Sequence, residues 1–397
     1  MAELEIRQVA GEAMVAAMYP LTNYAFRASP PFPDREEWGE MVRHREGVTC
    51  FAAFDGDTSV ACAESTAMTQ NVRGALLKMG GIWGVATHPA ARRRGICREL
   101  LLRLLSAMHE ADEAVSGLYP FRESFYERLG YVTFPQWREA TFSPLALAPL
   151  LKLDLDGEVE LALVGDGLDA YYEVTAEAQR GAHGMALITA HGMVPSSTDK
   201  AWIAVARSHG VPVGILLYTL AGEHVADFTM RVARFVTLSS LGRYLLLQWI
   251  ARHVDQASSV EVKLGPHDRI ETWLSDLKPH VATEPIAPMG RVVDVAGLGG
   301  LRVGEGGLRV RVRDAQCPWN EGAWRLEGAD GALQVTRLVE SAIVDGELSI
   351  QALSALVYGT HDPGDFAFRG WATLSEASIS ILRRVFPPML PHMYTRF

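Results

Sequence analysis

The chain has little lysine, few cysteines and no long uninterrupted apolar run. It carries five lysines against 32 arginines, and 47 acidic residues outweigh the 37 basic ones, giving a net charge of −10. No basic run is longer than Arg92-Arg93-Arg94. A nucleic-acid-binding protein generally needs a basic face, so the charge balance argues against that class.

The cysteines and histidines form no pattern typical of disulfide scaffolds or metal sites. Cys50, Cys62, Cys97 and Cys317 include no CxxC pair, and the twelve histidines form no HxH or HxxxH cluster. A disulfide framework or a zinc site would require such spacing. We therefore expect free cysteines, a reducing compartment and no metal.

Apolar segments of membrane-spanning length are also missing. The longest apolar run, at 211–222, contains Pro212 and falls short of the roughly 20 residues that a transmembrane helix needs. The first residues show no basic stretch followed by an apolar one, which is the pattern of a signal peptide. We expect a cytoplasmic protein.

The apolar pattern predicts mixed α and β structure in two or three domains. A chain of 397 residues with 48% hydrophobic side chains can form that number of cores. A predicted strand at 76–87 precedes a helix whose apolar stripe runs from Ile96 to Met108. Residues 159–283 repeat the same order of elements, and a third block begins near Gly290. The order indicates a duplicated fold followed by another domain.

The most informative stretch runs from Gly84 to Cys97, where a strand enters a short basic loop that opens a helix. Unpaired N–H groups at such a helix start bind anions. Gly95 permits a ligand to approach the backbone closely, and the arginines at 92–94 add charge where a pyrophosphate would bind. A solvated basic turn explains the same composition, so both interpretations stay open at this point.

The stretch resembles the acyl-CoA loop of the GCN5-related N-acetyltransferases (GNATs), R/Q-x-x-G-x-G/A. Here it reads Arg92-x-x-Gly95-x-Cys97, with cysteine in place of the last small residue. The resemblance implies acetyl-CoA as the acyl donor, and strand amides flanked by Val85 and Thr87 that polarise the thioester carbonyl. The cofactor-binding residues that it implies are Val85, Ala86, Thr87, Arg92, Arg93, Arg94, Gly95, Ile96 and Cys97.

A second segment of the same family follows at 125–131. It reads Phe-Tyr-Glu-Arg-Leu-Gly-Tyr and resembles the pattern F-Y-x-x-L-G-F/Y. By this resemblance Tyr126 is the general acid that protonates the departing thiolate, a task that suits a phenol with a pKa of about 10. Ordinary packing on a short helix is the other interpretation of Tyr126. Cys97 as a covalent acyl carrier is disfavoured, because it belongs to the phosphate loop.

Over nearly all of its length the chain resembles the Eis (enhanced intracellular survival) acetyltransferases. Segments 80–82, 289–295 (Met-Gly-Arg-Val-Val-Asp-Val) and 314–320 (Asp-x-x-Cys-Pro-Trp-Asn) support the likeness. It implies an α+β fold with two GNAT-like mixed-sheet domains and a sterol-carrier-like α/β domain, and a homohexamer. The implied domains are 1–142 (active), 143–289 (degenerate) and 290–397. No arginine run precedes Gly242, so we expect the central domain not to bind CoA.

The resemblance also assigns the catalytic base to the carboxylate of the last residue, Phe397. In Eis-type enzymes that group reaches into the active site of the N-terminal domain and accepts the proton of the amine. A proline-rich approach with aromatic Tyr394 and Phe397 favours a docked tail. A frayed terminus is the usual alternative.

Acceptor-binding residues are expected on the first two helices and on the strand before the loop, where the family places its pocket. The candidates are Tyr24, Phe26, Trp38, Trp83 and Gly84. Trp38 and Trp83 equally suit a hydrophobic core. The acidic residues at 34, 36, 37 and 40 either attract amines or form the solvated first turn of a helix.

These observations predict an acetyl-CoA-dependent N-acetyltransferase. It would act on primary amines of a small polyamine-like or aminoglycoside-like acceptor, by direct attack in a ternary complex. One alternative is an acyl-CoA-binding or lipid-binding sensor without turnover, and another is an acyltransferase acting on protein lysines. We expect no nucleic acid, membrane or metal as a partner.

Overall fold

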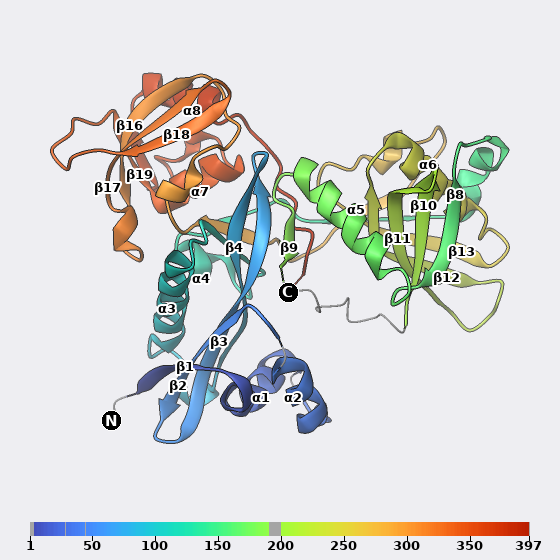
Figure 1. The fold of residues 1–397 in the computed structure, drawn as a ribbon, viewed down its shortest axis with the longest axis horizontal. Coiled ribbons are helices and arrows are strands. Elements are labelled where there is room, and N and C mark those ends of the chain that lie inside the picture. The colour runs from blue at the N-terminus through green and yellow to red at the C-terminus, as the bar shows by residue number, and fades with distance from the viewer. Residues whose placement is uncertain (1–3, 28, 44, 190–199, 397) are drawn as a thin grey trace. The chain divides into compact units, whose positions relative to one another are not determined.

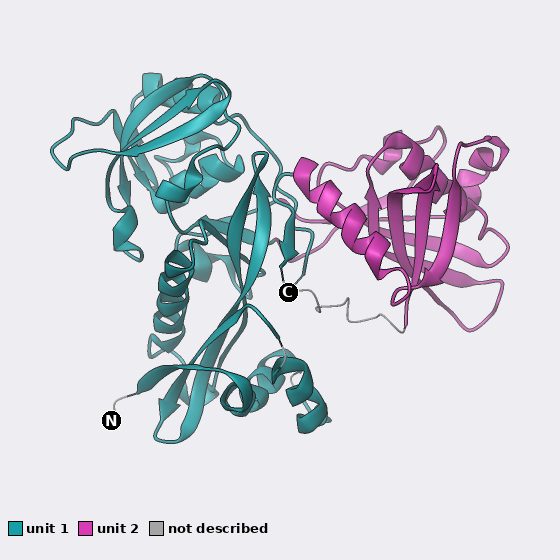
Figure 2. Cartoon of the chain, in the orientation of Figure 1, with its two compact units in different colours: residues 1–134, 183–192, 288–397 teal, residues 135–182, 193–287 magenta. Residues whose placement is uncertain are grey.

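The computed structural model describes residues 4–27, 29–43, 45–189 and 200–396. They form two compact units, shown in Figure 2. The first unit comprises residues 1–134, 183–192 and 288–397, and the second comprises 135–182 and 193–287. Neither unit is one continuous segment, because the chain leaves and re-enters the first unit.

The first unit contains a mixed sheet in the order β1-β2-β3-β4-β5-β15-β6, with β9 paired to β3 (Figure 1). β4 and β5 run parallel over only four residue pairs, from Met79↔Val115 to Ile82↔Leu118. The other pairings in this sheet are antiparallel. The strands are β1 Glu5–Val9, β2 Val48–Asp55, β3 Thr58–Val72, β4 Ala75–Thr87, β5 Val115–Leu118, β6 Val132–Thr133, β9 Ala186–Ile188 and β15 Met289–Val292.

Helices cover both faces of this sheet. The predicted apolar stripe of α3 (Ile96–Glu110) is confirmed, since each of its members is buried. The stripe packs against one face of β3, where Ala61 and Ala63 provide small side chains. Cys62, between them, points to the opposite face and packs in the core formed with α1 (Gly11–Arg27). The remaining helices here are α2 (Arg35–Arg43) and α4 (Glu123–Glu127).

The C-terminal part of the first unit forms a second sheet in the order β18-β17-β16-β19-β20. Its helix α7 (Ile350–Tyr358) is buried at every position except Gln351, between a Ser349 cap and a left-handed Gly359. The other elements are β16 Gly306–Arg313, β17 Gly322–Ala329, β18 Ala332–Arg337, β19 Gly346–Ser349, β20 Ala372–Leu374 and α8 Glu376–Val385.

The described residues of the second unit form a sheet in the order β14-β7-β13-β12-β11-β10-β8 with two α-helices. β12 and β13 are parallel and joined through a helix, as β4 and β5 are, so the predicted repeat of element order is present. The elements are β7 Arg138–Phe142, β8 Glu158–Leu163, α5 Leu168–Gly181, β10 Trp202–Ser208, β11 Val211–Ala221, β12 Phe228–Thr237, α6 Ser240–Ala251, β13 Ala257–Leu264 and β14 His280–Thr283.

Strands beside both predicted domain boundaries belong to the neighbouring sheet. β7 ends at the boundary at 142 and pairs with β13 and β14 in the second unit. β15 begins at the boundary at 289 and pairs with β5 and β6 in the first unit. The boundaries of the domains at 1–142, 143–289 and 290–397 stay predictions, because a strand can fold into a sheet beyond its own domain.

The helices are short throughout the described residues. The 17-residue α1 contains Pro20. Within the described ranges no helix has both the length and the apolar character needed to cross a membrane. Short 3-10 helices connect other elements, namely η1 Pro89–Ala91, η2 Pro144–Lys152, η3 Ile270–Thr272, η4 Ala296–Leu298, η5 Pro318–Asn320 and η6 Pro363–Asp365.

Candidate active site

The first sheet splits where β5 ends and β4 continues. Pairing between these strands stops at Ile82↔Leu118, yet β4 extends to Thr87. On its other side β4 is bulged, because Gly84 and Val85 together lie opposite one residue of β3, Ala63. A bulge re-aims the backbone of its strand. The segment predicted to hold the thioester therefore has a strand partner on one side only.

Gly84 is required at this bulge for two physical reasons. Its φ angle is +61°, in the left-handed region that side chains disfavour. A Cβ atom there would lie 2.8 Å from Oε1 of Glu64 and 2.9 Å from Cε of Met18. The close approach of these two side chains fixes the backbone beside Val85.

The loop after β4 leaves the start of α3 open. Gly95 precedes the helix with a φ of +79°, and no side chain caps the helix N-terminus. The arginines at 92–94 are exposed, and Nε of Arg92 donates to the carbonyl of Thr87 over 3.3 Å. Free N–H groups with arginines beside them form an anion site. Ile96 is buried and anchors the first turn of the helix.

Two predicted residues have strongly raised pKa values. Burial raises the pKa of the Cys97 thiol to about 12, so the thiol is neutral at pH 7 and a poor nucleophile. Burial, followed by the interaction with Cys97, raises the pKa of the Tyr126 phenol well above its usual range. Tyr126 is 2% exposed and packs edge-on against Phe121, Phe125 and Tyr131. The phenol keeps its proton and has one to donate.

The C-terminal tail docks beside the split. Met393 and Tyr394 are buried, and the hydroxyl of Tyr119, directly after β5, lies 3.1 Å from the Met393 carbonyl and 3.3 Å from that of Thr395. The tail is thus held as far as these residues. Phe397, the predicted base, lies outside the described residues.

The acceptor side contains an ion pair that sequence reasoning missed. Nη2 of Arg45 lies 2.9 Å from Oε2 of the fully buried Glu64, and the guanidinium lies 3.9 Å from the ring centroid of Trp83. Nε1 of Trp83 donates to Oγ1 of Thr66 over 2.8 Å. Trp83 is therefore covered on one face and tethered at its edge. The available signal was a single carboxylate in an otherwise uncharged strand, 58–72.

The other predicted acceptor residues lie on the first two helices. Tyr24 and Phe26 are 49% and 65% exposed in the last turn of α1. Trp38 on α2 is half-buried and packs edge-on against Tyr19, with 5.5 Å between ring centroids. The structure thus places Trp83 and Gly84 together at the bulge, and Tyr24 and Phe26 on an exposed surface.

The acidic turn of α2 behaves as a helix start. Oδ1 of Asp34 accepts from the N–H groups of Glu36 and Glu37 over 2.8 and 3.1 Å. Arg43 forms ion pairs with Glu12, Glu36 and Glu40. Arg43 therefore compensates one charge of this acidic group, and the region stays acidic overall.

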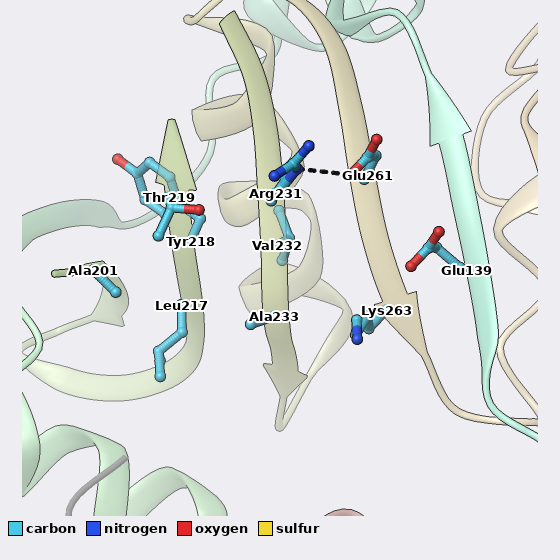
Figure 3. A pocket seen from close by; sticks show the side chains of 10 residues that line it. All are labelled: Glu139, Ala201, Leu217, Tyr218, Thr219, Arg231, Val232, Ala233, Glu261 and Lys263. Atoms are coloured by element: carbon cyan, nitrogen blue, oxygen red, sulfur yellow. Dashed lines mark hydrogen bonds and ion pairs between the residues drawn. The ribbon is translucent and has the colours of Figure 1, made fainter. Parts of the chain in front are cut away.

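The second unit has a corresponding split without a phosphate loop. β12 pairs with β13 as far as Val232 and then continues paired only with β11, with a bulge at Ala233. A cavity of about 160 Å³ opens there, lined by both apolar and charged side chains, and the charged ones include Arg231 and Glu261, paired over 3.1 Å (Figure 3). The start of α6 is capped, because Oγ of Ser239 accepts from the N–H of Gly242 over 3.1 Å. The capped start of α6 thus differs from the open start of α3, and the absence of CoA from the central domain stays a prediction.

Within the described ranges there is no cluster of three or more histidine, cysteine, aspartate or glutamate side chains that could hold a metal ion. All four cysteines are free. The groups that the structure brings together at the site are the backbone amides of the bulge, the protonated phenol of Tyr126 and the docked tail.

Comparisons with known sequences agree with this geometry. Acetyltransferase (GNAT) domain families match residues 5–134 and 188–295, and the sterol carrier protein domain family matches 298–394. An uncharacterized N-acetyltransferase of Streptomyces coelicolor is 27% identical over 345 residues, covering 80% of this chain and 82% of that protein. Another from Streptomyces avermitilis is 25% identical over 345 residues, covering 82% of each.

Solved structures share the fold along the whole chain. A GCN5-related N-acetyltransferase from Anabaena variabilis has a TM-score of 0.83 at 19% identity, covering 99% of this chain and 100% of that one. Eis1 from Mycobacterium abscessus has a TM-score of 0.78 at 19% identity, with the same coverage.

The chain is an N-acetyltransferase of the GNAT type. It combines two GNAT domains with a C-terminal sterol carrier protein domain, and it shares its fold with Eis1.

Proposed function

We propose that this protein transfers an acetyl group from acetyl-CoA to a primary amine of a small polyamine-like or aminoglycoside-like acceptor, within a ternary complex. One observation carries the proposal. At the split between β4 and β5, two features lie on neighbouring strands. β4 leads to the uncapped start of α3, and β5 ends beside Tyr119, which holds the tail.

The donor side follows from the loop and the bulge. Acetyl-CoA is the donor that GNAT domains use. We assign its pyrophosphate to the N–H groups that open α3 and to the arginines at 92–94. The backbone N–H groups of the bulge, beside Val85, would donate to the thioester oxygen. Donors aimed at a developing oxyanion are often the largest single contribution to catalysis.

The amine must lose a proton before it can attack. An alkyl ammonium has a pKa of about 10, so deprotonation at pH 7 costs about 4 kcal/mol at 1.36 kcal/mol per pKa unit. We assign this proton to the terminal carboxylate of Phe397. The docking of the tail up to Thr395 at the end of β5 supports the assignment.

The departing thiolate needs a proton in return. Tyr126 is our candidate, because its buried phenol remains protonated at neutral pH. Burial keeps the Cys97 thiol protonated at neutral pH as well. We therefore give Cys97 a packing role in the loop rather than a covalent one.

Recognition of the acceptor rests on the aromatic residues of α1 and α2. The exposed rings of Tyr24 and Phe26 offer faces on which an ammonium group can bind. Arg45 already occupies one face of Trp83, and Arg43 is paired with Glu36 and Glu40 of α2. We therefore assign ammonium binding to Tyr24, Phe26 and the tail carboxylate.

CoA thiol release from acetyl-CoA tests the proposal, with untagged protein and a panel of polyamines, aminoglycosides and lysine peptides. We expect amine-dependent turnover that is faster with the small polyamines or aminoglycosides than with the peptides. Peptide-only turnover would overturn the acceptor class, and bound acetyl-CoA without turnover on any amine would favour a sensor. Light scattering of the same sample tests the homohexamer that the family resemblance implies.

A further inference from the structure

We infer that Tyr119 is a positioning residue, which holds the last residues of the chain so that the terminal carboxylate is delivered to the split between β4 and β5. This inference rests on the proposed role of the carboxylate as base. Tyr119 follows Leu118, the last residue of β5 and of its pairing with β4. All four residues of β5 are buried between β4 and β15, so the backbone that carries Tyr119 is fixed.

The Tyr119 side chain contacts the tail at three positions. Its hydroxyl lies 3.1 Å from the carbonyl oxygen of Met393 and 3.3 Å from that of Thr395. A phenol has one hydrogen to donate, so the two carbonyls share it. The guanidinium of Arg396 lies 5.8 Å from the Tyr119 ring centroid, within cation–π range.

The tail depends on such external contacts, because it has no regular structure of its own. Residues 386–396 follow α8 without a helix or strand, and prolines stand at 387, 388 and 391. Backbone polar groups that leave water must find partners elsewhere. The N–H of His392 donates to the carbonyl of His183 over 2.9 Å, and Oγ1 of Thr395 donates to that of Ala186 over 2.6 Å. The tail therefore contacts both β9 and the residue that follows β5, and Figure 1 shows its last residues next to β9.

A separate anchor fixes where the tail begins. The buried Arg73, at the turn between β3 and β4, donates to the carbonyls of Leu356, Val357 and Pro387. Met393 then packs where Gly117 has no side chain, since a Cβ there would lie 2.6 Å from Cε of Met393. Arg73 holds the start of the tail ten residues before the chain ends. Tyr119 and Thr395 hold the part nearest the carboxylate.

The test is a double-mutant cycle on the full chain. The first change, Tyr119→Phe, keeps the ring and removes only the hydroxyl. The second change removes Phe397, so that the chain ends at Arg396, and the double variant carries both. A displacement of about 1 Å in a reacting group can cost about 100-fold in rate. We expect Y119F to lower kcat at least about 10-fold, with an unchanged dissociation constant for acetyl-CoA. We expect no further loss when Y119F is added to the shortened chain.

Matched variants separate positioning from stability. Tyr244→Phe removes a tyrosine hydroxyl that donates to the carbonyl of Trp273 over 3.2 Å, far along the chain in the second unit. We expect it to leave kcat unchanged. Thr395→Val removes the other tether near the terminus, and we expect the same kcat-specific loss as for Y119F. T395V carries the test if Y119F fails to fold.

The outcomes distinguish this inference from the proposed base. If the shortened chain loses turnover but Y119F and T395V keep full kcat, the inference is overturned and the terminal base stands. Losses that multiply in the double variant would mean that Tyr119 acts independently of the tail, which also overturns the inference. A shortened chain with full turnover would overturn both.

Discussion

Arg45 and Glu64 form a buried ion pair directly beneath the active-site bulge, with Nη2 and Oε2 2.9 Å apart. Glu64 has no exposed surface, and its Oε1 fills the space beside Gly84 where a side chain would otherwise lie. A buried carboxylate is costly without a partner. Arg45 thus supports the backbone that is proposed to hold the thioester, and several measurable consequences depend on this arrangement.

Glu64 should make stability depend on pH. Burial raises the pKa of Glu64 to about 7, although Arg45 opposes the shift. In the unfolded chain the carboxyl loses its proton near pH 4.5, so the unfolding free energy falls as pH rises from about 4.5 through about 7, by about 3 kcal/mol. The measurement is the unfolding free energy of the wild type and of Glu64→Gln, from denaturant unfolding at both ends of this pH window. Relative to wild type, the unfolding free energy of E64Q should rise by that amount from the low-pH end to the high-pH end.

Glu113 provides the control for this pH effect. Burial also raises the pKa of Glu113 to about 7, and this residue is present in both proteins of the comparison. Its contribution therefore cancels, and Glu113→Gln measures it separately. A stability difference between wild type and E64Q that does not change with pH would contradict the assignment.

Gly84→Ala should damage catalysis more than folding. The left-handed φ costs an alanine about 1–2 kcal/mol, and its Cβ would displace Glu64 and Met18. Movement of the Val85 amide should lower kcat by about 100-fold or more, measured as CoA thiol release. Gly165→Ala is the matched control, because its Cβ meets nothing within 4 Å. Equal kcat in G84A and G165A would remove the bulge from the mechanism.

The loop arginines should act on donor binding rather than on chemistry. The three variants are R92A, R93A and R94A. Any of them that loses a phosphate contact should show a KM for acetyl-CoA raised about 10-fold, with little change in kcat. R103A is the control, since Arg103 lies on the same helix, exposed, and pairs with Glu99. A matching rise in KM for R103A would mean that general charge, not the loop, attracts the donor.

Tyr126→Phe should lower kcat about 100- to 10,000-fold while the protein still binds acetyl-CoA. Only a hydroxyl is lost, and the edge-on packing with Phe121, Phe125 and Tyr131 remains. Steady-state kinetics and isothermal titration calorimetry check the two expectations. Less than a threefold fall in kcat would return Tyr126 to a packing role.

Local patterns predicted the elements that lead into the site. The apolar stripe from Ile96 to Met108 identified α3, and the Gly84–Cys97 stretch identified the strand, the loop and the open helix start. These features depend on residues a few positions apart, so a sequence displays them directly. The domain families agree with the three-part order that the resemblance predicted.

Contacts between distant residues could not be predicted in the same way. Arg45 and Glu64 lie on different elements, and neither belongs to a motif. β9 and β15 join the first sheet from positions far along the chain. No local sequence pattern indicates with which distant strands they pair. The acidic turn at 34–40 suggested attraction for amines, and only the structure shows that Arg43 pairs with two of its carboxylates and with Glu12.

The terminal carboxylate is the central claim, and its most direct test is the turnover of three chains that differ only at the end. These are the native chain, a chain ending at Arg396 and a chain with one added glycine, which shifts the carboxylate by about 3.5 Å. We predict that both altered chains lose at least about 100-fold in kcat at pH 7 and bind acetyl-CoA as the native chain does. The loss should shrink as pH approaches the pKa of the amine, about 10. Full turnover by either altered chain at pH 7 would contradict the account.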